Sequence, residues 1–131
     1  MPFVCTNYLN HVGKQKKDNG SCVRLVQLAC AGVPNTSLWR PGKQVKGNDI
    51  APGTVIATFN AEGRYPNLRR GNHAAFYHSQ DRHTLTVVDQ YVGARSIRKS
   101  NYKFDNPGGS LTANADTYYV VETEASLRSG S

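Results

Sequence analysis

The sequence predicts an α+β fold in which one helix precedes a series of strands. Residues 22–31 read CVRLVQLACA, an almost continuously apolar run of helical length. Several later segments are rich in apolar, β-branched and aromatic residues and end at turn residues, as strands do. The connections between these segments are short, which favours an antiparallel sheet. Because the helical pattern comes first and the strand patterns follow it without alternating, we expect an α+β fold.

The segment 22–31 carries start and stop signals for a helix. Ser21 is a residue type that caps helix N-termini, and Gly32 suits the position just past a C-terminus. The strongly polar members, Arg24 and Gln27, lie three residues apart and therefore share one narrow stripe of the helix surface. We expect the rest of the helix surface to be buried on most sides, which makes this the central helix of the domain.

The other elements follow from turn residues and apolar runs. A short helix is expected within residues 5–13, and residues 34–53, rich in Pro and Gly, are expected to form a long ordered loop. Residues 101–115 contain the turn-forming sequence NPGG and are expected to form a second loop. Strands are expected over residues 54–59, 73–78, 85–91 and 117–122, with a further short strand near residues 94–99.

The length of 131 residues fits one domain, and 38% hydrophobic residues is an ordinary globular composition. We expect residues 1–125 to form this single domain and residues 126–131, which read SLRSGS, to form a disordered tail. No apolar run approaches the ~18 residues that a membrane helix requires. The N-terminus has no charged start followed by an apolar stretch, so we expect synthesis in the cytoplasm without a secretory signal.

The chain is basic, with 16 Lys and Arg against 9 Asp and Glu and a formal net charge of +7. This charge favours a polyanionic partner, which could be nucleic acid, an anionic membrane or an acidic cell wall. The basic residues are scattered along the chain, and the sequence has no nucleic-acid-binding motif. A basic module that binds nucleic acid is therefore an alternative that charge alone supports.

The three cysteines, Cys5, Cys22 and Cys30, do not form the pattern of a disulfide framework or a C-x-x-C metal site. They leave a nucleophile, buried thiols, or a Cys5–Cys30 bridge with one free thiol. Cys22 stands at the start of the predicted helix, where unpaired N–H groups and the helix dipole favour an anion. A thiol at that position has a lowered pKa, so Cys22 is the candidate nucleophile, whereas Cys30 has the character of a buried thiol.

A cysteine nucleophile needs a base, and His73 is the histidine placed for that role. It begins the apolar strand HAAFY, so its side chain is expected at the rim of the sheet, where a helix terminus can meet it. His78 lies five residues later and faces the opposite side of the strand. His83 falls in a predicted hairpin loop and His11 in the weakly patterned N-terminal segment. No HExxH or paired-cysteine element accompanies the histidines, so no metal is expected.

A residue that orients the imidazole is expected on the strand that reads LTVVDQY. Its polar pair, Asp89 and Gln90, points to opposite faces of the strand, so only one of the two can share a face with His73. A carboxylate stabilises an imidazolium more strongly than an amide does. Asp89 is therefore preferred, and Gln90 stays open as the alternative.

Four blocks of sequence, in this order, resemble the NlpC-type and CHAP-type cell-wall amidases. They are GSCVRLVQ at residues 20–27, PGTVIA at 52–57, NHAAFY at 72–77 and VVDQY at 87–91. The first block resembles the nucleophile helix of that superfamily, and the third resembles the strand that begins with the catalytic histidine. Within the superfamily, the small size, the missing signal peptide and the Asp-Gln block most resemble the type VI secretion amidase effectors, particularly families 2 and 3.

The resemblance implies a papain-like, NlpC-type α+β domain in which a buried nucleophile helix packs on an antiparallel sheet. It implies a cysteine amidase with catalytic Cys22, His73 and Asp89 and no cofactor, which hydrolyses stem-peptide or crosslink amide bonds of Gram-negative peptidoglycan. It further implies an antibacterial toxin that type VI secretion delivers into the periplasm of a target cell. The implied partner is a cognate immunity protein, and neither nucleic-acid binding nor membrane insertion is then expected.

Three kinds of residue are candidate substrate contacts. The first are the sequence neighbours of the nucleophile and of the orienting residue, and the second is the tryptophan of the long loop, which could form a wall of the cleft. The third are arginines, which can pair with free carboxylates of stem peptides. These candidates are Ser21, Trp39, Gln90 and Arg70, with Arg40 and Arg69 as further arginines. A non-catalytic domain that binds cell wall or nucleic acid is the alternative. An unreactive Cys22 thiol at neutral pH would favour that alternative.

Overall fold

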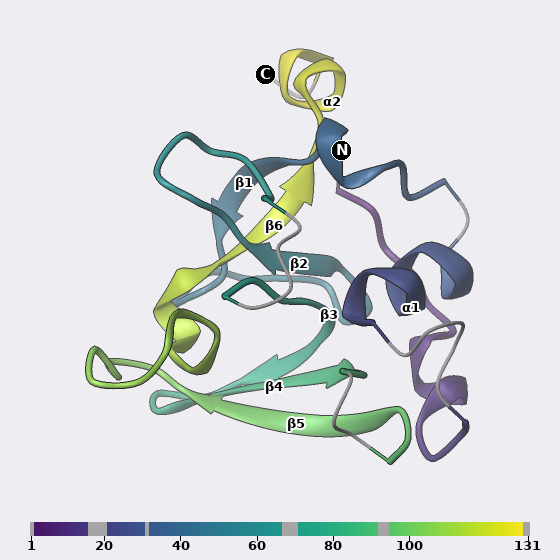
Figure 1. Ribbon diagram of the computed structural model, residues 1–131, viewed down its shortest axis with the longest axis vertical. Helices are drawn as coiled ribbons and strands as arrows, with labels where there is room; N and C mark the ends of the chain where they lie inside the picture. Colours follow the sequence, from purple (N-terminus) through teal and green to yellow (C-terminus); the bar gives the residue numbers. More distant parts are fainter. Residues whose placement is uncertain (1, 16–20, 31, 67–70, 92–94, 130–131) are drawn as a thin grey trace.

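The computed structural model describes residues 2–15, 21–30, 32–66, 71–91 and 95–129 of the chain. Over these residues, an antiparallel six-stranded sheet with the order β1-β6-β2-β3-β4-β5 forms the centre of the molecule (Figure 1). The strands are β1 (Arg40–Gln44), β2 (Val55–Thr58), β3 (Ala74–Gln80), β4 (Thr84–Asp89), β5 (Arg98–Lys103) and β6 (Tyr118–Glu122). The helices are α1 (Cys22–Ala29) and α2 (Glu124–Ser129), with the short 3-10 turns η1 (Tyr8–His11), η2 (Thr36–Leu38), η3 (Leu111–Ala113) and η4 (Ala115–Thr117). The predicted α+β class with an antiparallel sheet is confirmed.

The pairing of β3 with β4 brings the start of one strand beside the end of the other. Phe76 pairs with Val88 in antiparallel register. His73, just before β3, and Asp89, the last residue of β4, therefore fall on the same face of the sheet. On its other side, β4 pairs with β5, where Asp89 is opposite Arg98. This register explains how residues far apart in sequence converge at one end of the three strands.

The two faces of the sheet bury separate apolar clusters. On one face, α1 packs against β3, and the buried Leu25 and Val26 of the helix join a cluster with Phe76 and Val88. On the opposite face, the second cluster includes Val87. The consecutive residues Val87 and Val88 thus point into different clusters, as a strand that is covered on both faces requires.

Helix α1 is less deeply buried than the sequence predicts. Val23, Leu25 and Val26 are buried, whereas Leu28 is 53% exposed. The helix ends at Ala29, whereas the sequence predicts that it continues to residue 31. A helix that packs on one face of a sheet leaves its outer stripe to solvent, even where that stripe carries a leucine. The expectation that α1 is buried on most sides is therefore wrong for its outer stripe.

The long loop expected at residues 34–53 contains the turn η2 and the strand β1, a strand that the sequence does not predict. The residues of β1, RPGKQ, include Pro and Gly, which are uncommon in strands. β1 lies at the edge of the sheet and pairs with β6 alone, so Pro41, which has no N–H, is tolerated. The register shifts between Pro41 and Gln44, which marks an irregular edge strand.

Strand β5 lies further along the chain than expected. The sequence predicts a short strand near residues 94–99, whereas β5 begins at Arg98 and continues to Lys103, inside the segment expected to be a loop. Its residues are mostly polar, and it forms the other edge of the sheet, where it pairs with β4. An edge strand of this kind has little apolar pattern, which is why its position is poorly predicted.

Helix α2 occupies part of the segment where a disordered tail is expected. Its start is stabilised by a reciprocal cap between Thr123 and Ser126. The N–H of Thr123 donates to Oγ of Ser126 over 2.8 Å, and the N–H of Ser126 donates to Oγ1 of Thr123 over 3.1 Å. In the described part of the chain, neither this helix nor α1 has the length and apolarity needed to cross a membrane.

Candidate active site

Cys22 is the first residue of α1, as the sequence predicts. Ser21 caps the helix, and its Oγ accepts a hydrogen bond of 3.3 Å from the N–H of Arg24. The carbonyl of Ser21 accepts a bond of 2.7 Å from Nε2 of Gln90, just beyond β4. The start of the helix is therefore attached to the sheet, and its unpaired N–H groups and dipole favour a thiolate at Cys22.

His73 and Asp89 form a buried pair at the adjacent ends of β3 and β4. The Nε2–H of His73 donates to Oδ2 of Asp89 over 2.7 Å, and the two side chains are 8% and 0% exposed. The backbone N–H of His73 donates to Oγ1 of Thr58 in β2 over 3.1 Å. Both residues are thus held in place by neighbouring strands of the sheet.

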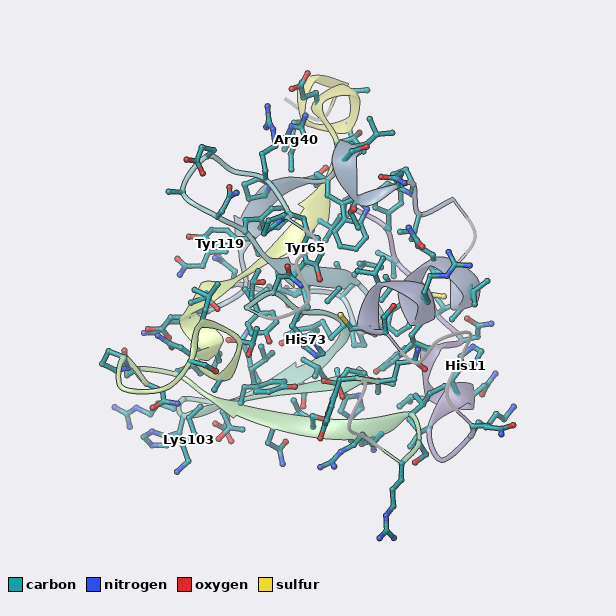
Figure 2. The ribbon with its side chains drawn as sticks, in the orientation of Figure 1. His11, Arg40, Tyr65, His73, Lys103 and Tyr119 are labelled. Carbon is teal, nitrogen blue, oxygen red and sulfur yellow. The ribbon has the colours of Figure 1, made fainter. Side chains whose placement is uncertain are left out.

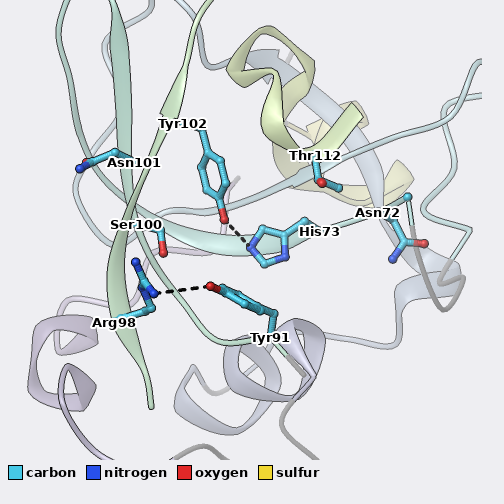
Figure 3. A pocket seen from close by; sticks show the side chains of 9 residues that line it. Asn72, His73, Tyr91, Arg98, Ser100, Asn101, Tyr102 and Thr112 are labelled. Atoms are coloured by element: carbon cyan, nitrogen blue, oxygen red, sulfur yellow. Dashed lines mark hydrogen bonds between the residues drawn. The ribbon is translucent and has the colours of Figure 1, made fainter. Parts of the chain in front are cut away.

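Strand β5 supplies further donors to the carboxylate of Asp89. Oγ of Ser100 donates to Oδ1 over 2.6 Å, and the hydroxyl of Tyr102 donates to Oδ2 over 2.7 Å. The same hydroxyl lies 3.4 Å from Nε2 of His73 (Figure 3). Both oxygens of the fully buried carboxylate therefore have hydrogen-bond donors, as a charge removed from water requires.

The contact between this pair and Cys22 changes how both His73 and Cys22 titrate. Burial alone lowers the pKa of His73, but the hydrogen bond to Asp89 and the contact with Cys22 raise it to about 9. Burial raises the pKa of Cys22, but the hydrogen bond and charge of His73, with a smaller contribution from the N–H of Ala74, lower it on balance. Because Nε2 of His73 is engaged with Asp89, Nδ1 is the ring nitrogen that remains for the thiol. The arrangement favours a thiolate beside an imidazolium.

Tyr65, labelled in Figure 2, is a neighbour of the Cys22 thiol that the sequence alone does not identify. Its hydroxyl lies 3.7 Å from Sγ of Cys22 and accepts a bond of 3.2 Å from Nδ2 of Asn72. Burial, with the charge of Cys22 next, raises the pKa of Tyr65, so the phenol keeps its proton and can donate it towards the thiolate. Tyr65 lies between β2 and β3 in a segment without a strand or helix pattern, so only the fold brings it to the site.

A cavity of about 470 Å³ opens beside His73 (Figure 3). Its described lining residues, besides His73, are Gly71, Asn72, Tyr91, Arg98, Ser100, Asn101, Tyr102 and Thr112. Cys22 does not line this cavity. A ligand in the cavity would therefore approach the reactive groups from the imidazole side.

Two of the predicted substrate contacts are core residues. Trp39 is fully buried, and its Nε1 donates to the carbonyl of Pro34 over 3.1 Å, so it does not form a wall of the cleft. Gln90 is also fully buried, and its Nε2 donates to the carbonyl of Ser21. Ser21 stays beside the thiol, with its hydroxyl engaged as the helix cap. Of the two orienting candidates, Asp89 is the one whose side chain is hydrogen-bonded to the imidazole of His73, at 2.7 Å.

Of the three arginines expected at the site, the structure describes Arg40. Arg40 pairs with a glutamate of α2 over 3.4 Å and lies at the end of the molecule that carries α2, away from His73 (Figure 2). Arg69 and Arg70 lie outside the described residues. Among the described lining residues, the arginine is Arg98, at the start of β5.

The remaining cysteines are structural. Cys5 and Cys30 are buried free thiols, so no disulfide joins them. Sγ of Cys5 donates to the carbonyl of Ala29 over 2.9 Å, at the end of α1. Burial, with the neighbouring Cys5 thiol next, raises the pKa of Cys30 to about 12. Within the described part of the chain, no cluster of three or more His, Cys, Asp or Glu side chains is placed to hold a metal ion.

The chain is similar to known proteins along most of its length. The family described as Domesticated amidase effector 2 matches residues 2–121. The type VI secretion amidase effector 2 protein of Salmonella typhi is 38% identical over 135 residues, which cover 93% of this chain and 100% of that protein. The solved structure of type 6 secretion amidase effector 2 (Tae2) matches with a TM-score of 0.83 and 36% identity, covering 95% of this chain and 96% of that one.

These similarities confirm the resemblance to type VI secretion amidase effectors, and they favour family 2 over family 3. They also confirm the papain-like α+β fold that the resemblance implies. The expectation of an amidase effector is confirmed with them. The chain belongs to the Domesticated amidase effector 2 family.

Proposed function

We propose that this amidase effector is a cysteine amidase in which Cys22 is the nucleophile, His73 the base and Asp89 the orienting carboxylate. The observation that carries the proposal is the buried hydrogen bond of 2.7 Å between His73 and Asp89. It lies beside a thiol whose pKa His73 lowers and which begins a helix. Nucleophile, base and orienter in mutual contact are what acyl transfer by a cysteine requires.

In the proposed reaction, the Cys22 thiolate attacks the carbonyl carbon of the scissile amide. The backbone N–H of Cys22, at the start of α1, is a donor for the oxyanion that forms on the carbonyl oxygen. His73 then gives its Nδ1 proton to the departing amine, and a thioester remains on Cys22. The neutral imidazole next takes a proton from water, whose oxygen attacks the thioester carbonyl; the C–S bond then breaks, which releases the carboxylic acid product and restores the thiolate–imidazolium pair. No cofactor takes part in these steps.

Asp89 contributes to this reaction through His73. Its carboxylate holds the imidazole by Nε2 and stabilises the imidazolium. Ser100 and Tyr102 are positioning residues in the proposal, because their hydroxyls fix the two carboxylate oxygens. A charge that is held in place before the reaction needs no reorganisation when the proton moves.

The proposed substrate is Gram-negative peptidoglycan, with the scissile amide in a stem peptide or a crosslink. The similar proteins are named as type VI secretion amidase effectors, which supports export by that route and an antibacterial role. The formal charge of +7 suits an acidic cell wall. Action in the periplasm of the target cell, and a cognate immunity protein that protects the producing cell, are part of the same proposal.

Digestion of purified Gram-negative sacculi tests the proposal through the release of new amine termini. The wild-type protein is expected to release them, and Cys22→Ala is expected to lower the rate by about 10³-fold or more, since the nucleophile is lost. Cys30→Ala is the matched control, because it removes a thiol that lies at the other end of α1. Undiminished release by Cys22→Ala would sink the mechanism, and no release by the wild type would remove the substrate assignment.

A further inference from the structure

A guanidinium group stands on the wall of the cavity beside His73. Arg98 begins β5 and is opposite Asp89 in antiparallel register, so its side chain lies on the sheet face that carries Asp89 and Ser100. The same cavity of about 470 Å³ is bounded by Arg98 and by His73 (Figure 3). A ligand that fills this cavity therefore meets a fixed cation next to the proposed base.

The charge of Arg98 is not neutralised by any carboxylate in the described part of the protein. Its Nη1 donates to the hydroxyl of Tyr91 over 3.5 Å, and the ion pairs of the described residues do not include it. Asp89, its partner in register, has both oxygens occupied by donors from other residues. Arg98 is also exposed, so the rest of its N–H donors remain available to a ligand.

The surroundings of Arg98 favour an anion. None of the described lining residues of the cavity is acidic. The charge of His73, on the same wall, is offset by the Asp89 carboxylate at 2.7 Å, so Arg98 is the cation that a ligand meets among the described lining residues. A concave site with charges of one sign attracts ligands of the other sign. The planar guanidinium matches a carboxylate in particular, because its parallel N–H groups meet the two oxygens.

We propose that Arg98 binds a free carboxylate of an acidic peptide substrate, a carboxylate that is not part of the amide to be cut. This inference rests on the proposed function, in which Cys22 and His73 cut the peptide. With the carboxylate on Arg98, the peptide lies against His73, and its scissile amide is directed towards Cys22. Arg98 is thus a specificity residue that acts on substrate binding more than on the chemical step.

The test compares two synthetic stem-like peptides, one with free carboxylates and one with the same carboxylates amidated. Wild type is expected to have the lower KM for the free form. Arg98→Ala is expected to raise that KM about tenfold, because a hydrogen bond to a charged group is worth about a factor of ten in binding. Its kcat, and its KM for the amidated peptide, are expected to stay near wild type. Arg98→Lys is expected to fall between the two, since it keeps the charge and loses the planar fork.

Two controls make the result specific to Arg98. Arg82→Ala removes an exposed arginine in the turn between β3 and β4 and is expected to keep the wild-type KM for both peptides.

Calorimetric binding of both peptides to Cys22→Ala, with and without Arg98→Ala, measures the subsite independently of hydrolysis. If wild type cuts neither peptide while binding depends on Arg98, the proposed function fails and this inference stands. Equal affinity for the free and amidated peptides, no binding of either, or an unchanged KM in Arg98→Ala would overturn the inference.

Discussion

The two halves of the candidate site are held by different means. On the sheet side, Asp89 is fully buried at the end of β4, and His73, Ser100 and Tyr102 all donate to its carboxylate. On the helix side, Cys22 is half-buried at the first residue of α1. The sheet side is therefore a closed hydrogen-bond network, whereas the helix side ends at a half-buried thiol.

This difference separates two tasks of the proposed mechanism. The sheet side carries the Asp89 carboxylate, which raises the pKa of the His73 imidazole. Asp89 lies on β4, which pairs with β3 on one side and with β5 on the other. The helix side carries the sulfur atom that forms and breaks bonds. It is positioned by the Ser21 cap of α1 and by the hydrogen bond from Gln90 to the carbonyl of Ser21. Changes on the sheet side should therefore disturb proton transfer and stability together, while changes on the helix side should mainly disturb the position of the nucleophile.

The largest effect is expected from Asp89→Asn, which keeps the shape of the side chain and removes its charge. The negative charge that raises the pKa of His73 is lost and the hydrogen bond from Nε2 is no longer charge-assisted, so the imidazolium that stabilises the Cys22 thiolate becomes scarce. We expect kcat on peptidoglycan to fall by about 10²–10⁴-fold, the size of a general acid–base contribution. Asp105→Asn is the control, since it alters an exposed aspartate paired with Lys46. A loss smaller than tenfold would mean that the carboxylate does not act through His73.

A smaller effect is expected from Tyr102→Phe, which removes one donor from Oδ2 of Asp89 and keeps the ring. We expect kcat to fall about tenfold and the free energy of unfolding to fall by about 1–3 kcal/mol, since a buried charged acceptor loses a partner. Urea denaturation and peptide hydrolysis measure the two effects on one sample. Tyr119→Phe, a tyrosine of β6 whose ring packs on Phe59, should change neither quantity appreciably. A variant with reduced stability and wild-type kcat would assign Tyr102 a structural role alone.

Gln90→Leu tests the link between the two halves. The substitution conserves volume and removes the amide that donates to the carbonyl of Ser21. We expect kcat to fall several-fold and the free energy of unfolding to fall by about 1 kcal/mol, the usual net contribution of one hydrogen bond. An unchanged kcat would indicate that packing of α1 on β3 positions Cys22 without this bond.

The smallest effect is expected from Ser21→Ala, which removes the side-chain cap of α1. Loss of such a cap lowers the free energy of unfolding by about 1 kcal/mol. Ser21→Asn restores a capping oxygen, so thermal denaturation should place its stability close to wild type. Equal stability of all three proteins would mean that the bond to Arg24 contributes nothing to holding the start of the helix.

Much of this arrangement is predictable because it depends on local patterns. The apolar helix that begins at Cys22 and the strands that follow it show in the spacing of apolar residues, and their order predicts the fold class. The placement of Cys22 at a helix start and His73 at a strand start follows from the same pattern. The alternation of side chains along a strand separates Asp89 from Gln90, although only the register decides which of them reaches the histidine.

The features that the sequence does not predict depend on long-range contacts. Tyr65, Ser100 and Tyr102 reach the site through strand pairing and loop folding, and their own segments carry little pattern. Trp39 has the residue type of a cleft wall, but packing against Tyr65 at 4.9 Å between ring centroids buries it. The sequence does not single out Arg98, because it begins β5, a polar edge strand whose position the apolar pattern places too early.

The pH dependence of Cys22 alkylation by iodoacetamide, followed by peptide mass spectrometry, tests the central claim most directly. His73 lowers the pKa of Cys22 from its ordinary value of 9.0, so the midpoint of the wild-type reaction is expected below pH 9. In His73→Ala, the lowering contribution is lost and burial, which raises the pKa, remains, so the reaction should move to higher pH. Cys30, whose pKa is raised to about 12, should stay unlabelled in the folded protein. Identical curves for wild type and His73→Ala, with a midpoint at or above pH 9, would contradict the thiolate–imidazolium pair.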